Sequence, residues 1–145
     1  MAGTIHTPHT PRNGRILVVD DELSIRKPIR IALLQVGYEV IEAVDGQEAI
    51  RALGEGDNPL MVDAILCDIR MPRVNGIDAI HFFRTHYPSI PVIVLTGYPD
   101  WDLAVTLMKM GVRDYLMKPV TKQDLIRVLK CAVENHTLFK GHFVA

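Results

Sequence analysis

Cysteine is scarce in this sequence of 145 residues, which contains only Cys67 and Cys131 and no C-x-x-C pair. This count excludes a disulfide-rich scaffold and a zinc site of the usual spacing, and it favours a reducing compartment such as the cytoplasm. Neither sign of charge dominates, since 16 Lys and Arg residues against 17 Asp and Glu residues give a net charge of −1. A basic surface for direct nucleic-acid binding is therefore not expected.

Long apolar runs are missing as well. Runs such as 16–19 and 92–95 reach only four residues, so we expect no membrane-spanning segment, no signal peptide and no membrane partner. The composition, with 48% hydrophobic and 23% charged residues, is nevertheless that of a soluble globular protein. A chain of this length corresponds to one domain.

Short apolar runs alternate with helical patterns after Gly14. The runs are rich in Val and Ile and predict five strands, at 15–20, 38–43, 62–67, 91–95 and 114–117. The second run alternates apolar and polar residues and is the predicted edge strand. The intervening segments carry apolar residues three or four positions apart and predict helices. Strict alternation of strands and helices predicts an α/β fold, with a parallel sheet covered by helices on both faces.

The two ends of the chain lack this pattern. Residues 1–13 are polar and rich in Pro and Thr, and we expect them to form a flexible leader. Residues 14–137 form the predicted domain, and residues 138–145 form a C-terminal tail that is too short for an output domain.

The most reactive side chains lie where the predicted strands end. The first strand ends in Asp20 and Asp21, the third in Asp68, the fourth in Thr96 and the fifth in Lys118. Ligands of an open parallel sheet bind beyond these carboxyl ends, near the point where the strand order reverses. These five side chains are therefore expected to meet at one edge of the sheet.

Three neighbouring carboxylates repel one another unless a cation neutralises their charge. Mg²⁺ suits this task because it prefers oxygen ligands, carboxylates among them. A carboxylate can also act as a nucleophile and carry a phosphoryl group, whose charge a metal ion and a lysine stabilise. The residue types thus predict Mg²⁺-dependent phosphoryl transfer to an aspartate.

Four blocks of sequence resemble the receiver domain of two-component response regulators. They are Ile16-Leu-Val-Val-Asp-Asp-Glu22, Asp68-Ile-Arg-Met-Pro-Arg-Val-Asn-Gly76, Leu95-Thr-Gly97 and Asp114-Tyr-Leu-Met-Lys-Pro119. The blocks occur in the order that the family has, each at the end of the expected strand. The resemblance covers roughly residues 14–137 and implies a flavodoxin-like, doubly wound (βα)5 fold with strand order 2-1-3-4-5.

The resemblance assigns roles to the acidic residues. It implies that Asp68 is the phosphoacceptor and that Asp20 and Asp21 bind Mg²⁺. Asp68 and the backbone carbonyl of Arg70 would be the other metal ligands from the protein. In receivers, the positions of Arg70 and Tyr98 tune the rate of self-dephosphorylation.

The resemblance also assigns roles at the ends of the fourth and fifth strands. Lys118 would bind one phosphoryl oxygen and Thr96 another. Thr96 and Tyr115 would form the switch pair, with Tyr115 changing rotamer when Thr96 moves toward the phosphoryl group. The peptide bond before Pro119 would be cis.

The implied function is that of a signalling switch, not of an enzyme with a small-molecule product. A sensor histidine kinase or a phosphotransfer protein would donate the phosphoryl group, and the domain would catalyse only its own phosphorylation and dephosphorylation. A downstream effector or a second copy would bind the face formed by the fourth helix, the fifth strand and the fifth helix. The expected location is cytoplasmic, and the chain is either a stand-alone regulator or a piece of a longer one.

Three other functions fit parts of the pattern. A metal-dependent phosphohydrolase with an aspartyl nucleophile would need an acid at position 70, where this chain has Arg70. A flavin carrier of similar topology would bring a phosphate against Asp20, Asp21 and Glu22, which would repel it. A receiver-like module that no longer takes phosphate is disfavoured because the key residues are all present. The later histidines show no ligand spacing and are predicted to lie on the surface: His81, His86, His136 and His142.

Overall fold

The computed structural model describes residues 13–70, 76–98 and 100–144, with side chains described as far as residue 138. The predicted leader, apart from Asn13, and residues 71–75 of the second sequence block lie outside the described residues. The strands are β1 (Gly14–Val19), β2 (Tyr38–Ala43), β3 (Val62–Asp68), β4 (Val92–Thr96) and β5 (Asp114–Met117). The helices are α1 (Leu23–Val36), α2 (Gly46–Leu53), α3 (Asn58–Met61), α4 (Gly76–His86), α5 (Trp101–Lys109) and α6 (Lys122–Val144).

The five strands form one parallel sheet in the order β2-β1-β3-β4-β5. This order confirms the predicted fold class and topology. The central strand β3 is buried along its whole length, whereas β2 and β5 are half-exposed edge strands, as the alternating pattern predicted for β2. The strand order reverses between β1 and β3, which places their carboxyl ends at the expected position for a ligand.

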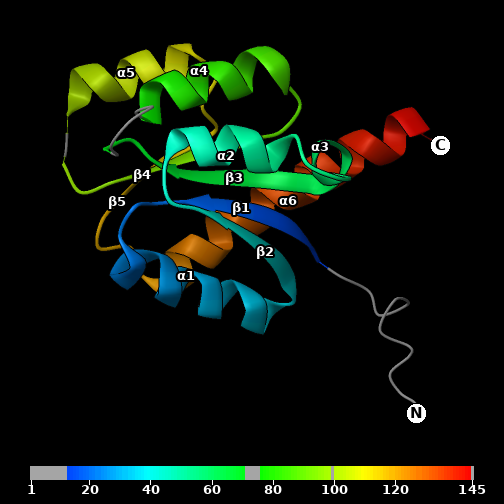
Figure 1. The fold of residues 1–145 in the computed structure, drawn as a ribbon, viewed down its shortest axis with the longest axis horizontal. Helices are drawn as coiled ribbons and strands as arrows, with labels where there is room; N and C mark the ends of the chain where they lie inside the picture. The colour runs from blue at the N-terminus through cyan, green and yellow to red at the C-terminus, as the bar shows by residue number, and fades with distance from the viewer. Residues whose placement is uncertain (1–12, 71–75, 99, 145) are drawn as a thin grey trace.

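Helices cover both faces of the sheet: α1 and α6 lie on one face, and α2, α4 and α5 lie on the other (Figure 1). Side chains of a strand alternate between these layers because successive residues point to opposite faces. In β1, Ile16 and Val18 pack toward α1 and α6, whereas Leu17 and Val19 pack toward α2, α4 and α5. The buried core on both faces holds the strand ends in fixed positions.

The sequence pattern did not predict α3. This helix has only four residues, Asn58–Met61, and a single turn is too short to show a helical period. Its Asn58 side chain donates a hydrogen bond to the carbonyl of Ala52, 2.7 Å away. Because of this extra helix, the predicted output face of fourth helix, fifth strand and fifth helix corresponds to α5, β5 and α6.

Helix α6 is longer than the domain boundary at residue 137 suggests. It runs without a break from Lys122 to Val144, and its last turns extend past the sheet (Figure 1). The C-terminal boundary of the domain at residue 137 therefore remains a prediction. Neither α6 nor any other helix in the described part of the chain has an apolar stretch long enough to cross a membrane.

The prediction that His136 lies on the surface was wrong. Its side chain is buried, and Nδ1 lies 2.9 Å from Oδ1 of Asp63, a buried residue near the start of β3. The physical reason is helical periodicity, since His136 lies four residues after Ala132 and three after Val133 on the buried side of α6. His81 and His86 are exposed, as predicted, and the side chain of His142 lies outside the described residues.

Candidate functional site

The carboxyl ends of β1 and β3 bring three carboxylates together. Asp68 ends β3, and Asp20 directly follows β1, the neighbouring strand. Carboxylate oxygens of Asp20, Asp21 and Asp68 lie within 4.8 Å of one another. Asp20 and Asp68 are buried, whereas Asp21 is exposed, so the acidic cluster is accessible to a ligand from solvent.

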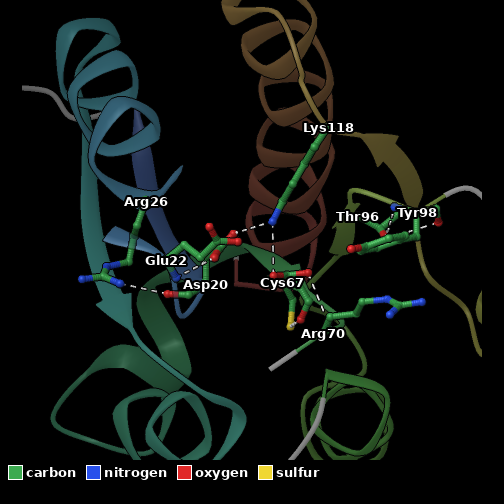
Figure 2. A network of polar contacts seen from close by, with 9 residues as sticks. Asp20, Glu22, Arg26, Cys67, Arg70, Thr96, Tyr98 and Lys118 are labelled. Carbon is green, nitrogen blue, oxygen red and sulfur yellow. Dashed lines mark hydrogen bonds and ion pairs between the residues drawn. The ribbon is translucent and has the colours of Figure 1, made fainter. Parts of the chain in front are cut away.

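Lys118 reaches the acidic cluster from the end of β5. Its ammonium Nζ donates a hydrogen bond to Oδ2 of Asp68, 3.2 Å away, and lies 3.0 Å from Oδ2 of Asp20 (Figure 2). The backbone N–H of Lys118 donates to the carbonyl of Thr96, 2.7 Å away, and the bond between Lys118 and Pro119 is cis. The lysine charge is thus held between the two buried carboxylates.

Opposing effects act on the pKa of the Asp68 carboxyl group. Burial raises the pKa of its carboxyl group, and the charge of Asp20 raises it further. The backbone N–H of Arg70, which donates to Oδ1 over 3.2 Å, and the ammonium of Lys118 lower it, but the net direction is upward. Burial alone would lower the pKa of Lys118, yet Asp20 and Asp68 together raise it above its usual range. The lysine stays charged, and the cluster retains negative charge that a cation can neutralise.

The donor set fits a magnesium ion. Oδ2 of Asp20 is buried, and the ammonium of Lys118 pairs with it over 3.0 Å. Three carboxylates lie together here with one ammonium group between two of them, so the cluster carries negative charge that a divalent cation can neutralise. Mg²⁺ takes hard oxygen ligands, usually one or two carboxylates with waters and a phosphate oxygen. Asp20, Asp21 and Asp68 offer these ligands.

Thr96 and Tyr115 are linked through one backbone carbonyl. Thr96 is buried at the end of β4, and its Oγ1 accepts a hydrogen bond from the N–H of Tyr98 over 3.2 Å. The Thr96 hydroxyl also donates a hydrogen bond to the backbone carbonyl of Tyr98, 3.5 Å away. The hydroxyl of Tyr115 donates to the same carbonyl over 3.4 Å. Thr96 therefore engages the turn after β4 rather than the acidic cluster.

Cys67 lies next to Asp68 but does not compete with it as a nucleophile. Its thiol is fully buried and lies 3.2 Å from the carbonyl of Asp68 as a donor (Figure 2). Burial raises the pKa of the Cys67 thiol far above its usual range, and the charges of Asp68 and Asp20 add to this shift. Since the thiolate is the reactive form of cysteine, Cys67 is inert at neutral pH.

Comparison with known proteins decides the family. The response regulator receiver domain matches residues 16–130, which is most of the chain. The chain belongs to the receiver family. It is 40% identical over 123 residues to the transcriptional regulatory protein ZraR of Klebsiella oxytoca, covering 85% of this chain and 27% of that protein. It is 37% identical over 127 residues to the probable transcriptional regulator ycf27 of Cyanophora paradoxa, covering 86% of this chain and 51% of that protein.

Solved receiver structures share the whole fold. A response regulator receiver domain protein from Clostridium thermocellum superposes with a TM-score of 0.77 at 36% identity, over 90% of this chain and 99% of that one. A CheY-like receiver domain protein from Methanospirillum hungatei JF-1 gives a TM-score of 0.79 at 27% identity, over 86% of this chain and 96% of that one. The receiver fold is a signalling fold and not that of a typical enzyme. The chain spans about a quarter to a half of the length of the two curated relatives.

Two features near the receiver site were not predicted from the sequence. The guanidinium of Arg70 lies over the ring of Tyr98, 3.9 Å from its centroid, so these two residues form one cation–π pair. Arg26 on α1 binds the backbone carbonyl of Asp20 (Figure 2), and it also binds Glu42 on β2. For Glu42, the alternation of apolar and polar residues along β2 was the available signal. For Arg26, the spacing of residues gives no indication that its side chain folds back to the carbonyl of Asp20.

The raised pKa of Asp68 predicts how the receiver domain responds to pH without metal. A carboxyl group whose pKa is higher in the folded than in the unfolded chain destabilises the fold progressively as pH rises from the unfolded to the folded pKa. Asp68→Asn is therefore expected to raise the thermal unfolding midpoint in EDTA near pH 7, and the gain should shrink toward about pH 4. Thermal unfolding followed by circular dichroism checks this. A lower midpoint for Asp68→Asn near pH 7 would contradict it.

Proposed function

We propose that this receiver domain accepts a phosphoryl group on Asp68 in a Mg²⁺-dependent reaction and changes conformation in response. The observation that carries the proposal is the placement of the Lys118 ammonium within 3.2 Å of Asp68, beside the carboxylates of Asp20 and Asp21. Phosphoryl transfer needs positive charge around the phosphoryl oxygens, and this site supplies one lysine and ligands for one divalent ion. The family to which the chain belongs supports the same reading.

The residues of the site divide the proposed reaction among them, and Asp68 takes part both as nucleophile and as metal ligand. A carboxylate oxygen of Asp68 attacks phosphorus, forming a P–O bond while the P–N bond to a histidine of the donor breaks. Asp20, Asp21, Asp68 and the backbone carbonyl of Arg70 would hold Mg²⁺, which neutralises the charge that develops on the phosphoryl oxygens. Lys118 exchanges its bond to Asp68 for one to a phosphoryl oxygen.

Partners follow from this chemistry. The donor would be a sensor histidine kinase or a phosphotransfer protein, because a phosphorylated imidazole transfers its group readily to a carboxylate. Relatives such as ZraR are named transcriptional regulatory proteins and are longer than this chain, which supports a downstream effector as the output partner. Two free cysteines support a cytoplasmic location, where such partners are found.

Intact-mass spectrometry after incubation with acetyl phosphate tests the proposed reaction. With Mg²⁺ present, the protein should gain the mass of one phosphoryl group, and EDTA should prevent the gain because the acidic cluster is then without its cation. Complete absence of a gain at saturating Mg²⁺ would overturn the proposal. A gain that continues with release of phosphate over many turnovers would indicate a phosphohydrolase instead.

The carbonyl of Tyr98 suggests how phosphorylation reaches the output face. A phosphoryl oxygen is a stronger, charged acceptor for the hydroxyl of Thr96 than the carbonyl of Tyr98 is. When Thr96 turns toward Asp68, its contacts to Tyr98 break, and the turn that also holds the hydroxyl of Tyr115 is released. Tyr115 can then move into the space beside Thr96.

Tyr115 also lines a pocket on the α5–β5 side of the predicted output face. This pocket has a volume of about 350 Å³ and is lined mainly by apolar side chains, including Trp101, Met108 and Met117. Trp101 is 86% exposed, and Met108 and Met117 are about half-exposed. Movement of Tyr115 therefore reshapes a surface that a protein partner can bind, which is a shift between two packings that differ by a few kcal/mol.

Amide hydrogen exchange is expected to detect this shift. Adding beryllium fluoride and Mg²⁺ should change protection across residues 96–127 as well as around Asp20 and Asp68. Thr96→Ala is the matched control, since it removes the hydroxyl that senses the phosphoryl group and should confine the change to the acidic cluster. Protection changes confined to that cluster in the unmodified protein would show that the domain carries phosphate without switching.

A further inference from the structure

Arg26 connects three elements around the acidic cluster without entering it. Its Nη1 donates a hydrogen bond to the backbone carbonyl of Asp20 over 2.9 Å (Figure 2). Its Nε lies 2.8 Å from Oε1 of Glu42 on β2. The side chain of Arg26 is only 12% exposed, so a guanidinium with little access to solvent is committed to these two bonds. Buried charges of this kind are retained where their geometry is fixed by good partners.

The carbonyl that Arg26 binds belongs to the peptide group between Asp20 and Asp21. The remaining polar groups of Asp20 are also fixed: its N–H donates to the carbonyl of Ala43 over 3.1 Å, and its Oδ1 accepts from the N–H of Glu22 over 2.9 Å. Its other oxygen, Oδ2, lies 3.0 Å from the ammonium of Lys118. Because a peptide group is planar, the direction of the Asp20 carbonyl determines where the backbone of Asp21 lies.

We infer that Arg26, held by Glu42, is a positioning residue for the metal site: it orients the 20–21 peptide so that both carboxylates face one Mg²⁺ ion. This inference rests on the proposed Mg²⁺-dependent function. Glu42 has a second task, since a cation beside a cation site is unfavourable and the carboxylate of Glu42 offsets the charge of Arg26. Arg30 also pairs with Glu42, through Oε2 at 3.3 Å, but no bond of Arg30 to Asp20 is found in the described residues.

A positioning role for Arg26 and a purely electrostatic role predict opposite changes in Mg²⁺ affinity when Arg26 is removed. If Arg26 acted only through its charge, removing it would tighten Mg²⁺ binding, because one repelling cation is lost. If Arg26 positions the 20–21 peptide, removing it weakens binding, since the carboxylates lose their arrangement. Outer partners of metal ligands typically change affinity by 10–100-fold when mutated.

Calorimetric titration with MgCl₂ distinguishes these outcomes. Arg26→Gln is expected to raise the Kd for Mg²⁺ by about tenfold. Arg30→Gln is the matched control, because it removes the same charge from the same helix and the same Glu42 network but leaves the Asp20 carbonyl bonded. Its Kd should stay within about twofold of that of the unchanged protein, as expected for an exposed charge screened by salt. Arg26→Lys should restore part of the affinity, and Glu42→Gln should weaken it less than Arg26→Gln does.

A kinetic readout separates positioning from a loss of folding. With acetyl phosphate, Arg26→Gln should raise the Mg²⁺ concentration for half-maximal phosphorylation by about tenfold, while the rate at saturating Mg²⁺ stays within about twofold. A misfolded variant would lose the maximal rate instead, in which case Arg26→Lys and Glu42→Gln decide the outcome through their own Kd values. Mg²⁺ binding by Arg26→Gln that is unchanged or tighter would overturn the inference while leaving the proposed function intact. If the titration detects no Mg²⁺ binding by the unchanged protein, and its result does not differ from that of Asp21→Ala, the proposed function is contradicted as well.

Discussion

Asp68→Asn is expected to abolish phosphoryl incorporation from acetyl phosphate at any Mg²⁺ concentration. The amide has nearly the size and shape of the carboxylate, so the fold is retained, but it has no anionic oxygen to attack phosphorus. The same change removes one ligand and one charge from the cluster of Asp20, Asp21 and Asp68. Intact-mass spectrometry measures the loss directly, and the expected result is complete rather than partial.

An exposed aspartate outside the site provides the control for this result. Asp102 lies in the first turn of α5 and is exposed, so Asp102→Asn changes the net charge equally without touching the acidic cluster. It should gain one phosphoryl group as the unchanged protein does. Full labelling of Asp68→Asn would show that another residue accepts the phosphoryl group, and peptide mapping would then identify it.

The sequence pattern predicted the α/β class and the residues at the strand ends for the same physical reason, whereas the strand order came from the resemblance to receiver domains. Buried parallel strands must be apolar over their length, so the polar residues that follow them mark the carboxyl edge of the sheet. Asp20, Asp68, Thr96 and Lys118 all lie at such positions, and the structure brings the two aspartates and the lysine into contact. Hydrophobic periodicity was sufficient to place these four residues, because it marks the residue at which each strand ends.

The features that the sequence did not predict depend on side chains that fold back across turns or on very short elements. Arg26 reaches Asp20 across the start of α1, and this requires a particular rotamer that spacing does not encode. Asn58 of the one-turn helix α3 bonds to the nearby carbonyl of Ala52 and accepts a hydrogen bond from Arg15, which is distant in sequence. His136 is different, since the buried stripe of α6 includes its position and a strict reading of the helical period would have placed it inside.

The second prediction concerns Gly76, the first residue of α4, which is packed directly against the backbone that carries Asp68. A Cβ atom at this position would lie 2.3 Å from Cα of Ile69 and 2.4 Å from the carbonyl oxygen of Asp68. These contacts involve main-chain atoms, so no side-chain rotation can relieve them. The N–H of Gly76 also donates to the carbonyl of Ile69 over 3.1 Å, which holds the two segments together. Gly76→Ala must therefore displace the end of β3 or the start of α4.

Gly76→Ala is expected to lower the free energy of unfolding by roughly 2–4 kcal/mol and to reduce the rate of phosphorylation at least about tenfold. The rate is expected to fall because the clash involves the backbone that carries Asp68, and a shift of this backbone moves the carboxylate away from Lys118. Gly54→Ala is the control: among the described residues its Cβ would meet no atom closer than the carbonyl of Arg51 at 3.7 Å, so both quantities should change little. Urea unfolding and the rate of mass gain measure the two effects. Gly76→Ala with the stability and rate of the unchanged protein would mean that β3 and α4 are not packed this closely, and the position proposed for Asp68 in the reaction would then have to be revised.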